Sequence, residues 1–326
     1  MIMNKKNYFI GIDGGSSKSV FVLYDGSGEA LERCELTGSS YRELGADGVC
    51  ALLEQGVAQV SGGIDRADIK GVCFGMPCYG ENAPDDDKAT RQIEKALGLP
   101  IRFENDVACA WAGPLALESG IVMLAGTGTM AWGCDIHGVM HRCGGWLSFF
   151  SDEGSGYWLG RGTLELFSKQ SDGRVKRGPL YDIVREHFAL NEDVEINGIV
   201  EAGYTSSRKK VASLQPLLLR AANAGDTGAL ELYHEAAGEL ALMVKGLRGR
   251  MELAPGSPVS YAGGLFNAGE IILGPFKKAM AGTDMVFTEP LLTPVDGAFL
   301  FAAERFDPEN LGRIRESLLN NRVSQL

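Results

Sequence analysis

The sequence predicts an α/β protein of two lobes that open with the same three-stranded unit. Its 326 residues are enough for two domains of ordinary size. Short apolar runs typical of buried strands alternate with stretches in which apolar residues recur at helical spacing. A strand–turn–strand pattern around Gly14 returns around Gly126, at an offset of 126 − 14 = 112 residues. We therefore expect an N-terminal lobe over residues 1–117 and a larger C-terminal lobe over residues 118–326, facing each other across a cleft.

Composition limits the classes of function. The chain carries 31 Lys and Arg against 42 Asp and Glu, a formal net charge of −11. Affinity for nucleic acid comes largely from cationic side chains, and the compact basic cluster at 208–210 is interpreted as a solvated face. No run approaches the ~20 apolar residues that span a bilayer, and the N-terminus lacks an apolar signal core. We expect a cytoplasmic protein with reduced cysteines and no nucleic-acid or membrane partner.

The stretch 9–21 is typical of strand, tight turn and strand, because two apolar runs flank a turn rich in Gly and hydroxyl groups. Its glycines allow successive N–H groups to converge on a spot that suits a phosphate-like anion. Asp13 ends the first strand, where its carboxylate can hold a divalent cation through water. Lys18 either reaches a phosphate oxygen or points to water. A plain hairpin turn is the competing interpretation, and the recurrence of the pattern favours the phosphate site.

The rest of the first lobe alternates strands and helices. The turn signal Asp25-Gly26 leads into a third antiparallel strand. Asp106 precedes a helical stretch, so its carboxylate either caps that helix or orients an attacking hydroxyl group and takes its proton. The phosphate turns favour the second role, and both can coexist. The elements expected after the second strand are a strand over 29–36, a helix over 45–61, a strand over 69–75, a helix over 89–97, a strand over 101–103 and a helix over 107–112.

The second lobe repeats this opening and then differs. Residues 121–132 match 9–21, and Gly138 falls on Gly26. One of the acidic pair Asp152 and Glu153 is expected to cap the helix that follows them. The later elements expected are a mainly helical region over 179–253, a strand, Gly-Gly turn and helix start over 259–266, a strand over 285–287, a helix over 296–306 and a last helix over 311–319. Whether that last helix docks back on the first lobe stays open.

Four residues near a predicted hairpin have side chains that can bind metal. If the turn is at His137, Cys134 pairs opposite His141. Cys134, His141 and Cys143 then share one face of the hairpin, while His137 lies at its tip. Three ligands on one face suit zinc, but the sequence offers no evident fourth. Packing of Cys143 beside the neighbouring Gly-Gly-Trp loop is the favoured interpretation, and metal binding stays open.

Taken together, these segments resemble the actin, sugar-kinase and heat-shock ATPase superfamily, and within it the BadF/BadG/BcrA/BcrD ATPase family, which includes N-acetylglucosamine kinases. The similarity covers residues 8–306. It implies two ribonuclease H-like lobes with ATP and Mg²⁺ in the cleft between them, and with Asp13 holding the Mg²⁺ through water. The ATP-binding residues that it implies are Asp13, Gly14, Gly15, Ser16, Ser17 and Lys18 in a first phosphate motif, Gly126, Thr127, Gly128 and Thr129 in a second, and Gly263, Gly264, Leu265 and Phe266 in an adenosine motif.

A sharper resemblance, to the amino-sugar kinases of that family, lies in the segments 143–146 and 152–158. It implies that the catalytic carboxylate is Asp106. Trp146 is compatible with an ordinary core, but an aromatic face also suits the apolar side of a pyranose, and we favour the pocket. Ser40 stands where the animal N-acetylglucosamine kinases have Asn, so the identity of the sugar stays open. The sugar contacts implied are Ser40, Tyr41, Asn105, Asp106, Thr127, Gly144, Gly145, Trp146, Asp152 and Glu153.

The sequence therefore predicts a homodimeric ATP-dependent kinase for N-acetylglucosamine, N-acetylmuramic acid or glucosamine, with transfer to O6 implied by the resemblance. A second hypothesis is the ATPase activator of 2-hydroxyacyl-CoA dehydratases, which shares the family and carries an iron–sulfur cluster. A third is a filament former or nucleotide-gated binding module that hydrolyses ATP without sugar. The length of the chain and its two pocket segments favour the kinase over the activator.

Overall fold

The computed structural model describes residues 7–15, 18–80 and 82–323, and its chain divides into two compact units. The first unit joins Met1–Glu118 to Glu289–Leu326, and the second comprises Ser119–Thr288. The first boundary lies next to the expected one. The second lobe was expected to run to residue 326, but the chain returns to the first unit after Thr288, because a C-terminal helix packs on the first sheet.

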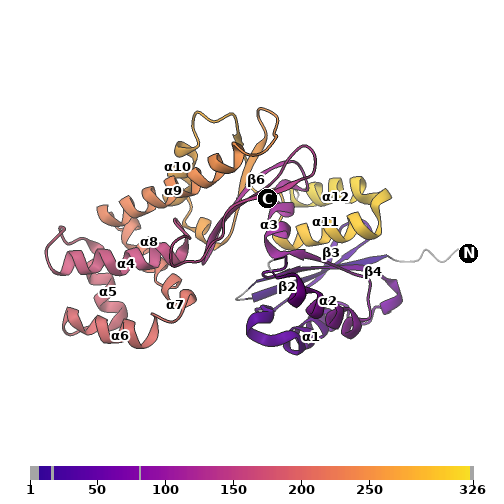
Figure 1. The fold of residues 1–326 in the computed structure, drawn as a ribbon, viewed down its shortest axis with the longest axis horizontal. Helices are drawn as coiled ribbons and strands as arrows, with labels where there is room; N and C mark the ends of the chain where they lie inside the picture. The colour runs from indigo at the N-terminus through magenta and orange to yellow at the C-terminus, as the bar shows by residue number, and fades with distance from the viewer. Residues whose placement is uncertain (1–6, 16–17, 81, 324–326) are drawn as a thin grey trace, which may run out of the picture. The chain divides into compact units, whose positions relative to one another are not determined.

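The first unit is built on a five-stranded sheet of order β3-β2-β1-β4-β5. The first three strands form an antiparallel meander, and β4 and β5 extend the sheet in parallel to β1. In Figure 1, α11 and α12 lie on one side of this sheet and α1 and α2 on the other. The elements are β1 (Tyr8–Gly14), β2 (Lys18–Asp25), β3 (Ala30–Thr37), α1 (Tyr41–Val60), η1 (Arg66–Asp68), β4 (Ile69–Met76), α2 (Ala83–Leu97), β5 (Ile101–Asn105), α3 (Asp106–Leu115), α11 (Pro294–Phe306), η4 (Pro308–Asn310) and α12 (Leu311–Val323).

The second unit repeats this topology in a sheet of order β10-β9-β6-β7-β8. Its meander β6–β8 is antiparallel, and β9 and β10 add in parallel to β6, so the duplication and the ribonuclease H-like lobes are confirmed. The elements are β6 (Gly120–Ala125), β7 (Thr129–Cys134), β8 (Met140–Gly144), α4 (Gly156–Ser171), α5 (Pro179–Phe188), η2 (Asp193–Glu195), α6 (Ile196–Gly203), α7 (Arg208–Ala212), α8 (Gln215–Asn223), α9 (Thr227–Arg248), β9 (Pro258–Ala262), η3 (Gly264–Ala268), α10 (Glu270–Ala279) and β10 (Val286–Phe287).

Helix α11 docks on the first sheet through a close backbone approach. A Cβ at Gly11 of β1 would lie 2.6 Å from the carbonyl oxygen of Val295, so only glycine lets the helix come this near. The ring of Tyr24 stacks on Phe299 at 4.1 Å, and its hydroxyl donates to Oδ1 of Asp296 at 2.7 Å. Phe299 is fully buried. The C-terminal segment is therefore part of the core of the first unit.

The hairpin between β7 and β8 has a different register from the expected one. The N–H of Asp135 donates to the carbonyl of Val139 at 3.0 Å, and Cys134 lies opposite Met140 instead of His141. The cause is the Asp135 side chain, which accepts from the N–H groups of His137 and Val139 and so stabilises a longer turn. A slip of one residue changes which side chains face each other.

The same side chains do not assemble a metal centre. Nε2 of His141 lies 2.9 Å from Oδ2 of Asp135, and all seven cysteines carry free thiols. Within the part of the chain that the structure describes, no group of three or more His, Cys, Asp or Glu side chains is placed to hold a metal ion. Nor does any helix among those residues combine the length and the apolar character that crossing a bilayer requires.

Candidate active site

The carboxyl ends of three neighbouring parallel strands bring Asp13 and Asp106 to one edge of the first sheet. Asp13, near the end of β1, pairs with Gly75 of β4, and the next residue of β4 pairs with Asn105 at the end of β5. Asp106 follows directly. Since β4 separates the two strands, the backbones that carry these carboxylates are two strand spacings apart, ~10 Å. That distance leaves room for a phosphoryl group and an acceptor hydroxyl group.

Asp13 occupies an environment that favours a nearby cation. Burial raises the pKa of Asp13 to about 6, against an ordinary value of 3.8, and the charge of Lys18 opposes this shift. The hydroxyls of Ser19 and Ser39 are buried and have no hydrogen-bond partner among the described residues. A Cβ at Gly14 would lie 2.5 Å from the Ser39 hydroxyl, so this group sits directly against the first phosphate turn. These hydroxyls beside Gly14, next in sequence to a desolvated carboxylate, are of the oxygen type that fits a hydrated Mg²⁺.

The remaining residues of the first phosphate motif are placed unevenly. Nζ of Lys18 pairs with Glu35 of β3 at 3.1 Å, and both side chains are exposed. Gly15 is held by its N–H, which donates to the carbonyl of Lys18 at 2.9 Å. The predicted phosphate contacts Ser16 and Ser17 lie outside the described residues.

Asn105 and Asp106 divide two roles that the sequence had assigned to one residue. The cap of α3 is Asn105, whose Oδ1 accepts from the N–H of Val107 at 2.9 Å. Its Nδ2 donates to the carbonyl of Tyr79 at 2.6 Å, so both ends of the amide are engaged. Asp106 is the first residue of the helix, and its Oδ1 also accepts from Val107, at 3.0 Å. The helix terminus favours the ionised carboxylate of Asp106.

The loop before α1 is tied to the first phosphate turn. The N–H of Ser39 donates to the carbonyl of Gly15 at 3.0 Å. Ser40 follows as the buried N-cap residue directly before α1. The hydroxyl of Tyr41 donates to Oδ1 of Asp86 at 3.2 Å, which directs that side chain towards α2. Ser40 is thus adjacent to the first turn, while Tyr41 is engaged within the unit.

In the second unit, the turn between β6 and β7 presents one of its two threonines. The N–H of Gly126 donates to the carbonyl of Gly128 at 2.9 Å, which closes the turn. Thr127 is exposed at its tip. Thr129 is buried, and its hydroxyl donates to the carbonyl of Glu153 at 3.1 Å. Thr127 can therefore contact a phosphate, whereas Thr129 ties the turn to the acidic segment beneath it.

Asp152 supports that turn from below. Its Oδ1 accepts from the N–H of Thr129 at 3.2 Å, and its Oδ2 pairs with the guanidinium of Arg208. Burial raises the pKa of Asp152, while the positive charge of Arg208 acts in the opposite direction. The expectation that Asp152 or Glu153 caps the following helix is wrong. Ser155 caps α4 by accepting from the N–H of Trp158 at 3.1 Å, because Asp152 is turned towards the phosphate turn.

The Gly-Gly-Trp segment is joined to the same turn. Gly144 and Gly145 have φ values of 80° and 69°, a region that favours glycine. The N–H of Gly145 donates to the carbonyl of Thr129 at 3.0 Å. Trp146 is 60% exposed, with the Arg142 guanidinium 5.1 Å from its ring centroid. This exposure excludes the core interpretation of Trp146 and leaves an aromatic face for a ligand.

In the predicted adenosine motif, the exposed part is glycine backbone, whereas the larger side chains are buried. Gly263 has a φ of 108°, and a Cβ there would overlap the carbonyl of Ala125, so the position requires glycine. Gly263 and Gly264 are exposed. Leu265 and Phe266 are buried in the core of the second unit. Only the two glycines of this motif are thus placed to meet a nucleotide directly.

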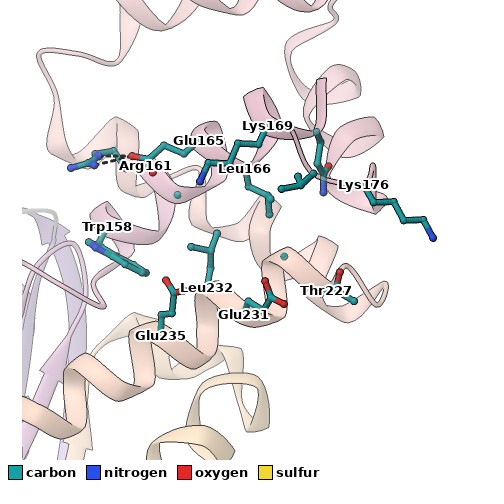
Figure 2. Close-up of a pocket in the computed structure, with 14 residues that line it drawn as sticks. Trp158, Arg161, Glu165, Leu166, Lys169, Lys176, Thr227, Glu231, Leu232 and Glu235 are labelled. Atoms are coloured by element: carbon teal, nitrogen blue, oxygen red, sulfur yellow. Dashed lines mark hydrogen bonds and ion pairs between the residues drawn. The ribbon is translucent and has the colours of Figure 1, made fainter. Parts of the chain in front are cut away.

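A separate hollow of about 330 Å³ lies between α4 and α9 in the second unit. Figure 2 shows Trp158, Arg161 and Glu165 of α4 on one side of it and Leu232 and Glu235 of α9 on the other. None of the predicted ATP or sugar residues lines it. The residues that the sequence assigns to ATP and sugar therefore do not coincide with this hollow.

One residue of the site escaped the sequence analysis. Arg208 pairs with Asp152, which lies 56 residues earlier in the sequence. Its only sequence signal was membership of a short basic cluster, which is more often a solvated face.

Comparison with known proteins identifies the family of the chain. A family model for the BadF/BadG/BcrA/BcrD ATPase family matches residues 10–302. An N-acetyl-D-glucosamine kinase of Dictyostelium discoideum is 29% identical over 79% of this chain and 85% of its own length. An N-acetylmuramic acid/N-acetylglucosamine kinase of Clostridium acetobutylicum is 28% identical over 83% and 89%. The solved structure of a candidate N-acetylglucosamine kinase from Chromobacterium violaceum has the same fold, with a TM-score of 0.71, 24% identity and coverage of 91% and 99%.

Proposed function

Because the chain belongs to the BadF/BadG/BcrA/BcrD ATPase family, we propose that it is an ATP-dependent kinase that phosphorylates an amino sugar. Relatives with that activity match most of the chain, and none of those named above is an activator of a dehydratase. The observation that carries the proposal is the pair Asp13 and Asp106 at one edge of the first sheet. The names of both relatives include N-acetylglucosamine, which supports this sugar as the substrate. The acceptor oxygen that we propose is O6, as the family resemblance implies.

The mechanism assigns one task to each group. Mg²⁺, held through water by Asp13, would neutralise charge on the phosphate oxygens. The turn at 126–129 would present the N–H groups of Thr127 and Gly128 and the Thr127 hydroxyl to the phosphates, because the N–H groups of Gly126 and Thr129 are bonded within the protein. Asp106 accepts a hydrogen bond from the attacking hydroxyl group and takes its proton during transfer. Trp146 offers its exposed face to the apolar side of the sugar ring.

The proposal is tested by ADP release in the presence of glucosamine, N-acetylglucosamine, N-acetylmuramic acid, N-acetylmannosamine or glucose. We expect an amino sugar to stimulate release, with N-acetylglucosamine the most effective. Equal basal ATP hydrolysis with and without every sugar would refute the kinase and favour an ATPase of another kind.

Asp106→Asn should lower kcat by about 10²- to 10⁴-fold, because the carboxylate that takes the proton is lost. The affinity for ATP should stay unchanged, since Asp106 is assigned to the acceptor. The matched control is Asp65→Asn, since Asp65 caps η1 and Asn caps equally well. Equal losses of ATP affinity and turnover, measured by calorimetry and by the ADP assay, would mean that Asp106 is structural.

We further propose that the protein acts as a homodimer in the cytoplasm. Light scattering coupled to size-exclusion chromatography tests the first statement, and fractionation of the source cells tests the second. A mass of about 35 kDa in solution would contradict the dimer, since one chain has a mass of 34.9 kDa.

A further inference from the structure

The basic cluster that begins α7 contains one residue that is unlike its neighbours. Lys209 and Lys210 are exposed, as a solvated face requires. Arg208 instead pairs with Asp152, whose side chain is only 3% exposed, while its own side chain is 48% exposed. Arg208 therefore pairs with a buried carboxylate while about half of its side-chain surface is in contact with solvent.

The guanidinium of Arg208 lies against the second phosphate turn. A Cβ at Gly128 would be 2.9 Å from Nη2 of Arg208 and 2.8 Å from Oδ1 of Asp152. Glycine at this position is what allows the cation to reach the backbone of the turn. Asp152 links the two, because its other oxygen accepts from the N–H of Thr129.

Packing within the second unit holds Arg208 in this position. Helix α7 lies so close to α4 that a Cβ at Gly160 would overlap the carbonyl of Val211. The start of α4 is in turn fixed to the phosphate turn, since the N–H of Gly156 donates to the carbonyl of Gly126 at 2.8 Å. The N–H of Tyr157 donates to the carbonyl of Thr127 at 3.2 Å. The turn, α4 and α7 thus form one packed assembly.

Arg208 offsets the negative charge of Asp152 at this assembly. A buried carboxylate directly under a phosphate turn would repel phosphate. Arg208 compensates that charge through Nη2, and no hydrogen bond engages its Nε or Nη1 among the described residues. The planar fork of an arginine matches the oxygens of a phosphate group.

We propose that Arg208 is a further phosphate-binding residue: its unused donors bond the phosphate chain of the nucleotide at the second turn, while Nη2 stays on Asp152. The inference rests on the proposed function for the identity of the anion. It assigns to Arg208 a direct contact with the substrate and to Asp152 the task of orienting it.

The test measures nucleotide binding without sugar, by calorimetry with ATP, ADP and AMP. Arg208→Gln should lower the affinity for ATP by about 10- to 100-fold, because a charged hydrogen bond is lost, and leave the affinity for AMP nearly unchanged. Lys209→Gln, one residue along the same helix, should change neither affinity. Unaltered ATP affinity in Arg208→Gln would overturn the proposal.

Loss of Arg208 also leaves Asp152 buried without its partner, so a second variant separates contact from support. Arg208→Gln combined with Asp152→Asn removes the unpaired charge and keeps an oxygen for the N–H of Thr129. If Arg208 touches phosphate, the double variant should still bind ATP weakly. Recovery of ATP affinity in the double variant would show that Arg208 only neutralises Asp152, and would overturn the proposal.

The nucleotide-binding test of Arg208 and the sugar assay of the proposed function can fail independently of each other. Wild-type protein that binds ATP through Arg208 but shows no sugar-stimulated ADP release would keep this inference and refute the kinase. Wild-type protein that phosphorylates an amino sugar, with Arg208→Gln equally active and equally tight for ATP, would do the opposite.

Discussion

Burial of the Asp13 carboxylate lowers the stability of the fold at neutral pH, and its proposed role in holding a cation explains why such a group is present. Its pKa is raised to about 6 in the folded protein, against 3.8 for an ordinary Asp, chiefly because burial disfavours the charged form. The stability associated with the protonated form is therefore fully present below pH 3.8 and is lost as the pH rises through about 6. A bound cation would offset this cost at neutral pH.

Asp13→Asn should consequently stabilise the metal-free protein at neutral pH. In the presence of a chelator we expect the free energy of unfolding to rise by about 1 to 3 kcal/mol at pH 7.5. The gain should shrink as the pH falls through about 6 and vanish near pH 4, which urea denaturation at a series of pH values measures. A gain that is independent of pH would contradict the assignment of the shift to Asp13.

The two threonines of the second turn should respond differently to removal of their hydroxyls. Thr127→Ala should raise the KM for ATP by about 10-fold with an unchanged melting temperature, since its hydroxyl is exposed and its proposed role is to contact the ligand. Thr129→Ala should instead destabilise the fold by about 1 to 3 kcal/mol, because the carbonyl of Glu153 loses its donor. The same behaviour in both variants would contradict the division of roles.

At the scale of single residues, the sequence predicted which residues belong to the candidate site better than it predicted which side chains contact each other. Asp13 lies near the end of β1 and Asp106 directly follows β5, a placement that follows from strand–turn patterns alone. The partners of Asp152 were not predictable, because Arg208 is 56 residues away and nothing local marks the contact. The cap of α4 was assigned to an acidic residue, although Ser155, one of the strongest capping types, was present in the same segment.

At the scale of elements, the glycines of α4 decide how close its neighbours come. Gly160→Ala places a Cβ where the carbonyl of Val211 stands, so α7 must move away from α4. We expect a loss of about 1 to 3 kcal/mol in stability, as for other overpacked sites, together with weaker ATP binding as Arg208 shifts. Thermal unfolding and calorimetry measure the two effects.

The control for that prediction is Gly238→Ala in α9. Apart from its chain neighbours and the backbone of its own helix, no atom lies within 4 Å of the position where its Cβ would be, so the substitution meets no obstacle. It should leave ATP binding unchanged and stabilise the helix by up to ~1 kcal/mol, because alanine has the higher helix propensity. If Gly160→Ala were as harmless as this control, the packing of α7 on α4 would not be what holds Arg208.

Hydrophobic periodicity predicted the helices and strands, but it did not always predict the residues at which they begin and end. Helix α2 begins at Ala83, earlier than the predicted start at Ala89, because the acidic residues of its first turns do not show the apolar spacing that the prediction used. The β7–β8 hairpin slipped because the side chain of Asp135 stabilises a longer turn than the His137-Gly138 signal suggested. Side-chain to backbone bonds of this kind compete with the pattern from which register is predicted.

At the scale of the molecule, the duplication was visible in sequence, while the path of the C-terminus was not. Two Gly-rich turns at a constant offset predicted two units of one topology, as the strand orders confirm. That α11 belongs to the first unit depends on contacts between residues far apart in sequence, such as Tyr24 with Asp296, 272 positions away. Hydrophobic periodicity shows that α11 has an apolar side, but not which sheet it covers.

The return of the chain makes the first unit dependent on both ends of the sequence. A chain ending at Thr288 lacks α11, so Phe9 and Gly11 of β1 lose the helix that covers them. We expect rapid proteolysis within residues 7–118 of this variant and survival of a fragment close to residues 119–288, whose core is formed without the C-terminal segment. A chain ending at Phe306 should keep the first unit folded but less stable by about 3 to 6 kcal/mol, because the apolar burial lost with η4 and α12 is chiefly that of Ile314 and Leu318. Limited proteolysis with mass spectrometry distinguishes these outcomes. Equal resistance of the full chain and the chain ending at Thr288 would mean that α11 does not complete the first core.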